Sequence, residues 1–141
     1  MLHELVADPG ELTASELYDR YVAELRAVID EHGIEKVAEA SEVDQETLRA
    51  LSNGDEPQLT LEESAALLAI SDDAPDGETI ATIARDELLI GMTNAVLDVE
   101  AVESGLDGEL EAREIQSKVE GRFPMTLREF ALLHQYIKGA R

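Results

Sequence analysis

The sequence predicts an all-α protein, and three observations lead to this fold class. The 141 residues include only five aromatic residues, three Tyr and two Phe. No run of alternating apolar and polar residues marks a half-buried strand. Three Thr residues each stand three positions before a Glu and lead into an apolar stripe of helical spacing. That arrangement is the sequence signature of a capping box, which begins a helix.

The first long helix is predicted over residues 14–32. Thr13 and Glu16 form its capping box, and Gly33 is the residue type that most often ends a helix. The apolar residues between them recur at steps of three and four, so they share one face of the helix. They are Leu17, Tyr18, Tyr21, Val22, Leu25, Val28 and Ile29.

Two short helices are predicted next. The first covers residues 34–40, and the second begins after Asp44, a residue type that caps helix N-termini. Leu48 and Leu51 lie on the inward face of this third helix, and Gly54 ends it.

A second capping box, formed by Thr60 and Glu63, begins a fourth helix that runs to about residue 70. Residues 71–78 are polar and contain Pro and Gly. This composition predicts a linker between two halves of the chain.

The second half is predicted to be helical as well. Two or more helices cover residues 78–106, and another begins near residue 110 or 111 and ends at Gly121. Thr126 and Glu129 form a third capping box, which begins a final helix that runs to about Lys138.

The second half repeats features of the first at a spacing of 67 residues. Gly54 and Gly121 are 67 residues apart, and so are Pro57 and Pro124. After each Pro the chain has the pattern T-L-x-E-x-A-x-L. Two amphipathic helical regions can resemble each other by chance, but coincident Gly, Pro and Thr positions favour a duplicated four-helix unit.

Residues 35–54 read EKVAEASEVDQETLRALSNG and resemble the helix-turn-helix of the λ-repressor/Cro family. The resemblance covers about residues 13–70, although Glu42 stands where that family usually has Gly in the turn. It implies an all-α fold of two tandem λ-repressor-like four-helix units with helix-turn-helix character. Residues 1–70 would form the first unit, 71–78 the linker and 79–141 a more degenerate second unit, and the two could pack as one domain. The residues that carry the pattern are Val37, Ala38, Ser41, Val43, Leu48, Leu51 and Gly54.

Acidic residues outnumber basic ones by 32 to 11, which gives a formal charge of −21. Abundant acids with only three lysines are typical of proteins that work in molar salt, where the Debye length is about 3 Å. We therefore expect a protein of a halophilic archaeon. No apolar run approaches the length of a membrane span, and the first residues lack the basic region of a signal peptide. The expected location is the cytoplasm, without membrane contact.

The basic residues are concentrated at the end of the chain. Residues 113–141 carry six bases and three acids, whereas residues 1–112 carry five bases and 29 acids. Arg and Gln on a helix face can contact phosphates and base edges of double-stranded DNA. The alternative is that these cations pair with acids inside the chain or across a homodimer. The candidate DNA-binding residues are Arg113, Gln116, Ser117, Lys118, Arg122 and Arg128.

The third helix is a weaker candidate for a recognition helix. Gln45 and Arg49 are residue types that read adenine and guanine, but Asp44 and Glu46 stand beside them. Phosphates repel these two carboxylates, so we expect less DNA contact here than in the second unit.

No catalytic or cofactor-binding pattern is found. The chain has no Cys, and its three histidines, His3, His32 and His134, are too scattered for a metal motif. The acidic segment 72–78 lacks the ligand spacing of a calcium loop. His134 is interpreted as a partly buried histidine whose hydrogen bonds are satisfied. We expect no cofactor, no metal and no enzymatic activity.

Two functional hypotheses follow from these features. The first is a DNA-associated transcriptional regulator. The second is a protein-interaction or structural module that keeps the helix-turn-helix fold without binding DNA. A continuous basic face around Arg113 on the folded molecule would favour the first hypothesis.

Overall fold

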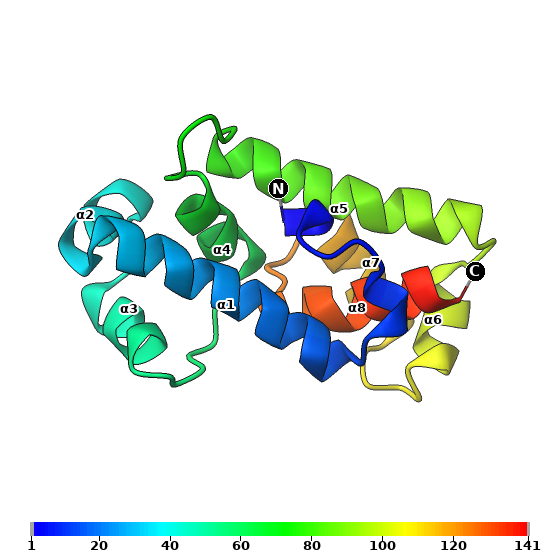
Figure 1. The fold of residues 1–141 in the computed structure, drawn as a ribbon. Coiled ribbons are helices and arrows are strands. Elements are labelled where there is room, and N and C mark those ends of the chain that lie inside the picture. The colour runs from blue at the N-terminus through cyan, green and yellow to red at the C-terminus, as the bar shows by residue number, and fades with distance from the viewer. Residues whose placement is uncertain (1, 141) are drawn as a thin grey trace.

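The computed structural model describes residues 2–140, and within them the all-α prediction is confirmed (Figure 1). Two short 3₁₀ turns precede the first long helix. The elements in chain order are η1 (Leu2–Glu4), η2 (Pro9–Glu11), α1 (Ala14–His32), α2 (Ile34–Ser41), α3 (Gln45–Ser52), α4 (Leu61–Leu68), α5 (Gly77–Asn94), α6 (Val99–Gly105), α7 (Ala112–Val119) and α8 (Leu127–Gly139).

All three predicted capping boxes form. In each, the Thr hydroxyl accepts from the backbone amide of the Glu, and the Glu carboxylate accepts from the Thr amide, at 2.9–3.1 Å. Both predicted ends of α1 are confirmed. Helix α4 ends at Leu68, earlier than expected, and α5 already begins at Gly77, so the connection between the halves is shorter than the predicted linker.

The turn between α2 and α3 has the left-handed residue that the resemblance implies, although that residue is not Gly. Glu42 has a φ of 63°, in the region that favours glycine. The Ser41 hydroxyl donates to the carbonyl of Val37 at 2.6 Å and accepts from the amide of Val43 at 3.2 Å. These bonds hold the turn and place strain on Glu42.

Replacing Glu42 with Gly is expected to raise the free energy of unfolding by about 0.5–1 kcal/mol, because glycine adopts a positive φ without steric cost. Denaturant unfolding at fixed high salt measures the change. Glu39→Gly, at an exposed position inside α2, is the control and should lower stability by about 1 kcal/mol. Equal destabilisation by both substitutions would contradict the strain at Glu42.

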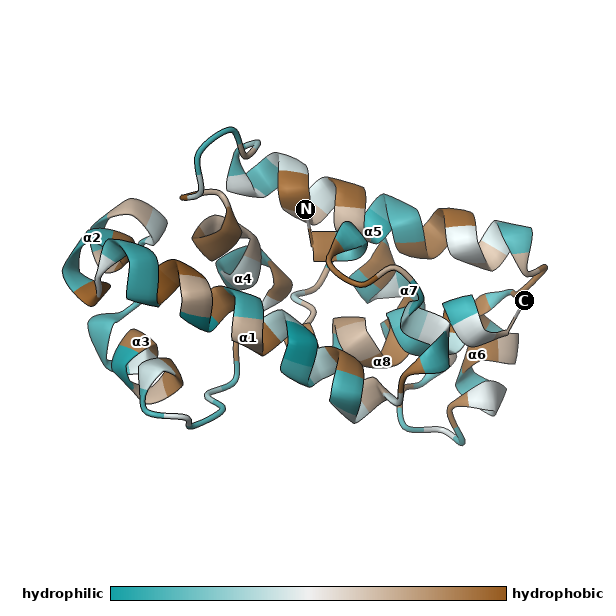
Figure 2. Cartoon of the chain, in the orientation of Figure 1, coloured by the Kyte–Doolittle hydropathy of each residue, from teal (hydrophilic) through white to brown (hydrophobic). Residues whose placement is uncertain are grey.

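The two halves share one hydrophobic core. Helix α1 packs along α8, and α5 packs along α4, so the first helix of each half lies on the last helix of the other (Figure 1). Apolar side chains of all eight helices belong to one buried cluster with the partly buried residues around it. Figure 2 shows that apolar and polar residues alternate around the helices with the period expected for amphipathic elements.

A short antiparallel contact joins the halves at their equivalent segments. Thr60 pairs with Thr126 in an isolated β-bridge. The amide of Leu61 donates to the carbonyl of Met125 at 2.7 Å, and the amide of Leu127 donates to that of Leu59 at 2.8 Å. Exchanging residues 59–61 with residues 125–127 converts one hydrogen bond into the other.

Helices α3 and α7 end in the same way. In each case a glycine with positive φ follows the helix, and two backbone amides donate back into its last turn, as in a Schellman motif. The longer of these bonds in sequence run from Asp55 to Ala50 and from Arg122 to Ser117, both at 2.9 Å. The glycines are Gly54 (φ 92°) and Gly121 (φ 80°). Donors, acceptors and glycines are all 67 residues apart.

The second half departs from the first between α6 and α7. Residues 106–111 connect these helices, whereas residues 42–44 suffice between α2 and α3. Asp107 and Gly108 both have positive φ in the longer connection. The tight turn of a helix-turn-helix is therefore seen between α2 and α3 and replaced by a wider turn in the second half.

Candidate functional site

The exposed face of α7 carries the first group of candidate DNA-binding residues. Arg113 is exposed and forms no ion pair within residues 2–140. Gln116 is exposed as well, and its side-chain amide donates to the Glu120 carboxylate at 3.4 Å. Ser117 is half-buried, and its carbonyl accepts the amide of Arg122 in the turn that ends the helix. Arg113 and Gln116 are thus directed to solvent, and Ser117 serves the helix end.

Lys118 is used inside the molecule. Its Nζ lies 2.5 Å from a Glu129 oxygen and 3.5 Å from a Glu114 oxygen, and its side chain is 15% exposed. A phosphate contact would have to displace these two carboxylates. The structure therefore removes Lys118 from any continuous basic face.

Arg122 and Arg128 also have acidic partners. Arg122 forms an ion pair with Glu120. The guanidinium of Arg128 lies over the ring of Tyr18, 4.1 Å from its centroid, and 3.7 Å from a Glu56 oxygen. Both arginine side chains keep a large exposed fraction, so these contacts neutralise them without burying them.

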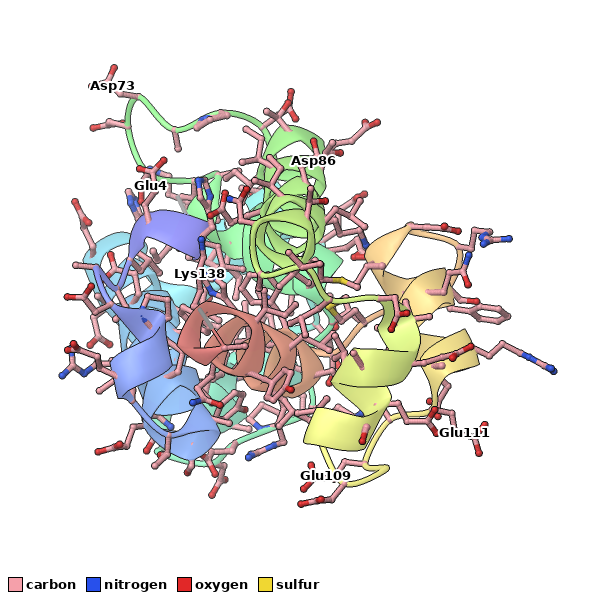
Figure 3. All side chains as sticks on the ribbon, turned by 90° about the vertical axis from the view of Figure 1, so that its right-hand side faces the viewer. Glu4, Asp73, Asp86, Glu109, Glu111 and Lys138 are labelled. Carbon is pink, nitrogen blue, oxygen red and sulfur yellow. The ribbon has the colours of Figure 1, made fainter. Side chains whose placement is uncertain are left out.

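Carboxylates surround the start of α7. Figure 3 labels Glu109 and Glu111, which point outward from the turn before this helix. Glu114 and Glu120 are exposed on the helix and just after it. The six basic residues of the segment 113–141 therefore do not form a continuous basic face within residues 2–140, and Arg141 lies outside the described residues.

The first candidate recognition helix is occupied locally. The Arg49 guanidinium donates to the Gln45 side-chain oxygen at 3.1 Å, one turn away on α3. Asp44 caps the helix by accepting from the amide of Glu46 at 3.2 Å. Both carboxylates are exposed beside Gln45, and they keep the surface of α3 acidic.

An arginine from the first helix of each half binds the end of the third helix. Arg26 donates from Nε to the carbonyl of Leu51 at 2.8 Å. Arg85 donates from Nε to the carbonyl of Lys118 at 2.9 Å and also pairs with Glu62 at 2.8 Å. Cations at helix C-termini satisfy carbonyls that lack intrahelical partners. Sequence reasoning missed these arginines because nothing local marks an acceptor that is 25 or 33 residues away.

A comparison with protein-family models matches residues 17–140. The chain belongs to DUF5791, a family of unknown function. No curated protein and no solved structure matches it. Among residues 2–140 of this DUF5791 chain, no helix is both long and apolar enough to cross a membrane, and no group of three or more metal-binding side chains is found.

Four large apolar side chains of the DUF5791 chain are exposed, and all of them lie between residues 89 and 123. Val96 is 90% exposed and has a φ of 56°, a strained conformation for a β-branched residue. We call these four side chains the apolar quartet. It comprises Leu89 and Ile90 at the end of α5, Val96 after α5, and Phe123 after α7. Helical periodicity gave no signal for it, because two of its members lie outside the helices.

His134 differs from its expected state in this DUF5791 chain. It is 1% exposed, and the Tyr21 hydroxyl lies 2.7 Å from its Nδ1. Its Nε2 has no hydrogen-bond partner among the described residues, so the histidine is buried and only half satisfied. Burial lowers the pKa of His134 to about 4, and nearby Lys138 lowers it further. The ring is therefore neutral at pH 7.

Proposed function

We propose that this protein is a non-enzymatic protein-interaction module with a helix-turn-helix-like fold, built from two related four-helix units, that does not bind DNA. The apolar quartet carries this proposal. Exposed apolar groups that gather in one part of a chain are a common feature of protein-interaction sites.

Val96 is the strongest member of the quartet. A left-handed, β-branched residue on the surface costs free energy that an Asn or Gly would not cost. Strain of this kind concentrates at functional sites. Contact with a partner would bury the Val96 side chain and offset that cost.

The partner that fits this surface presents apolar side chains flanked by cations. Asp86 lies one helical turn before Ile90, and Glu120 lies three residues before Phe123, and both carboxylates are exposed. Burial of apolar surface is not weakened by salt, whereas exposed ion pairs are screened. Such an interface would persist at the high salt that the composition predicts.

The charge distribution argues against DNA. Phosphate contacts supply most non-specific affinity for DNA and require free cations. In the segment 113–141, Lys118, Arg122 and Arg128 have carboxylate partners, and so does Lys138. The segment thus resembles the alternative in which its cations pair inside the molecule.

Several paired features support the two related units. The Thr60–Thr126 bridge and the two Schellman motifs relate the halves by the same exchange. The closest glycine contacts agree with it. A Cβ at Gly10 would meet the backbone of α8 at 2.6 Å, and one at Gly77 would meet the backbone of α4 at 3.2 Å. These glycines are also 67 residues apart.

DNA-associated regulation remains the second candidate, favoured by one observation. Arg113 and Gln116 are exposed near each other on α7, and these residue types bind base edges. In that case Arg113→Ala and Arg122→Ala would abolish binding, while Arg49→Ala would have little effect.

The interaction proposal is tested by placing a photo-crosslinking amino acid at Phe123 in the full chain within its native cells. Glu31, exposed at the far end of α1, is the control site. We expect one dominant protein to be captured at position 123 only, and to bind the purified chain. Val96→Asn should stabilise the fold yet weaken that binding at least tenfold. Equal capture at both sites, or unchanged binding by the Val96 variant, would contradict the proposal.

The DNA arm uses fluorescence anisotropy with a mixed-sequence duplex from 0.1 to 3 M KCl. We expect no saturable binding at any salt concentration. Saturable binding that disappears in Arg113→Ala but persists in Arg49→Ala would replace the interaction module with the regulator.

A further inference from the structure

A polar cavity of about 600 Å³ lies between the N-terminal segment, α5 and α8. Small-molecule sites commonly have volumes of this size, far above that of a single water. Figure 3 shows the labelled Glu4 and Lys138 on the same side of the molecule, next to this segment. The cavity is unrelated to the apolar quartet and shares no residue with it.

An ion pair crosses the cavity wall. The Nζ of Lys138 on α8 lies 2.6 Å from an Oε1 of Glu87 on α5, and their side chains are 17% and 25% exposed. This hydrogen bond lowers the pKa of Glu87, which keeps it charged. The cavity thus presents one fixed positive and one fixed negative charge side by side.

Two buried ring nitrogens without partners belong to residues that line the same cavity. They are His134 Nε2 and His3 Nδ1. Buried polar atoms in native proteins are nearly always hydrogen-bonded, so two unpartnered ones at one cavity indicate missing partners.

The proton positions on the two rings follow from their other nitrogens. Burial raises the pKa of Tyr21, so its hydroxyl keeps its proton and donates to His134 Nδ1. His134 therefore carries its proton on Nε2 and offers a donor. His3 Nε2 lies 3.2 Å from a Glu4 oxygen and donates to it, which leaves Nδ1 as an acceptor.

The cavity accordingly offers a donor beside a cation and an acceptor beside an anion. Its rim adds the exposed carboxylates of Glu4, Asp8 and Glu11, which repel simple anions and attract ammonium groups. The N-terminal segment is held in place because Gly10 packs against the backbone of Gly139, where no Cβ fits.

We propose that this cavity binds a free α-amino acid in its zwitterionic form. The carboxylate of the amino acid accepts from His134 Nε2 and Lys138. Its ammonium group donates to Glu87 and His3 Nδ1. A carboxylic acid alone or an amine alone would satisfy only half of these groups.

The test titrates glycine into the full chain at fixed high salt and follows the ring nitrogens by ¹⁵N–¹H correlation NMR, with calorimetry for affinity. Acetate and methylammonium are the half-ligand probes, and larger amino acids follow. We expect saturable shifts of the His134 and His3 rings with amino acids, but not of His32, and at least tenfold weaker binding of both half-ligands. Acetate binding as well as glycine, or no saturation with any amino acid, would overturn the proposal.

Variants separate binding from folding. Glu87→Gln and His134→Gln are expected to weaken amino-acid binding at least tenfold. Glu62→Gln, which breaks the Arg85 ion pair away from the cavity, is the matched control and should leave binding unchanged. Circular dichroism checks that each variant is folded. Equal loss of binding in the control variant would show that the effect is not specific to the cavity, and would contradict the proposal.

Discussion

The melting temperature is expected to fall by about 10 °C or more when KCl is lowered from 2 M to 0.1 M, which corresponds to about 3 kcal/mol for a domain of this size. The physical reason is the formal charge of −21. The Debye length grows from about 3 Å at 1 M salt to about 10 Å at 0.1 M, so exposed carboxylates repel one another over larger distances. The ion pairs that the structure shows are mostly exposed on at least one side and offset little of this repulsion.

Thermal unfolding followed by circular dichroism across a KCl series measures this effect. The matched control is a double variant, Asp72→Asn with Asp73→Asn, which removes two exposed charges from the loop between α4 and α5. It should melt higher than the parent at 0.1 M KCl and equally at 2 M. A melting temperature that does not change with salt would rule out the screening argument and the halophilic origin that it supports.

Acidification from pH 7 to pH 5 is expected to lower the free energy of unfolding by about 2 kcal/mol through His134 alone. The pKa of His134 is about 4 in the folded chain, below its ordinary value of about 6.5. The unfolded chain therefore takes up a proton in this range while the folded chain does not. The stabilisation is fully present above pH 6.5 and is lost as the pH falls toward 4.

Denaturant unfolding at fixed 2 M KCl tests this pH dependence. His134→Gln should remove most of the loss between pH 7 and pH 5, because Gln can bond to Tyr21 but does not titrate. The control is His32→Gln at the end of α1, which should keep the loss. If the parent and the His134 variant lose the same stability, another group is responsible.

The sequence located the helix ends well because their signals are local. Each capping box joins residues three positions apart, and each Schellman motif joins residues five apart, so the side chains and glycines that form them are adjacent in the sequence. The two 3₁₀ turns before α1 were not predicted, since three-residue turns have no apolar periodicity. Their position depends on Gly10 meeting α8 at the other end of the chain.

The candidate DNA-binding residues were chosen by residue type and helical face, and these criteria identify which side chains leave the helix but not what they meet. Lys118 looked available from the sequence, yet Glu129 approaches it from the next helix. Arg128 looked available as well, yet Tyr18 lies beneath it from α1. Such partners depend on how helices pack, which a pattern within one helix does not contain.

The sequence by itself determined the fold class, the starts of α1, α4 and α8, the ends of α3 and α7, and the 67-residue echo, because hydrogen bonds between near neighbours fix these features. Only the tertiary structure decided how the halves join, which cations are left free, and why His134 has one ring nitrogen bonded and the other not. Those outcomes depend on contacts such as Thr60 with Thr126 and Tyr21 with His134. Residues so far apart in the sequence are brought together by burial of the shared core, which acts on the whole chain at once.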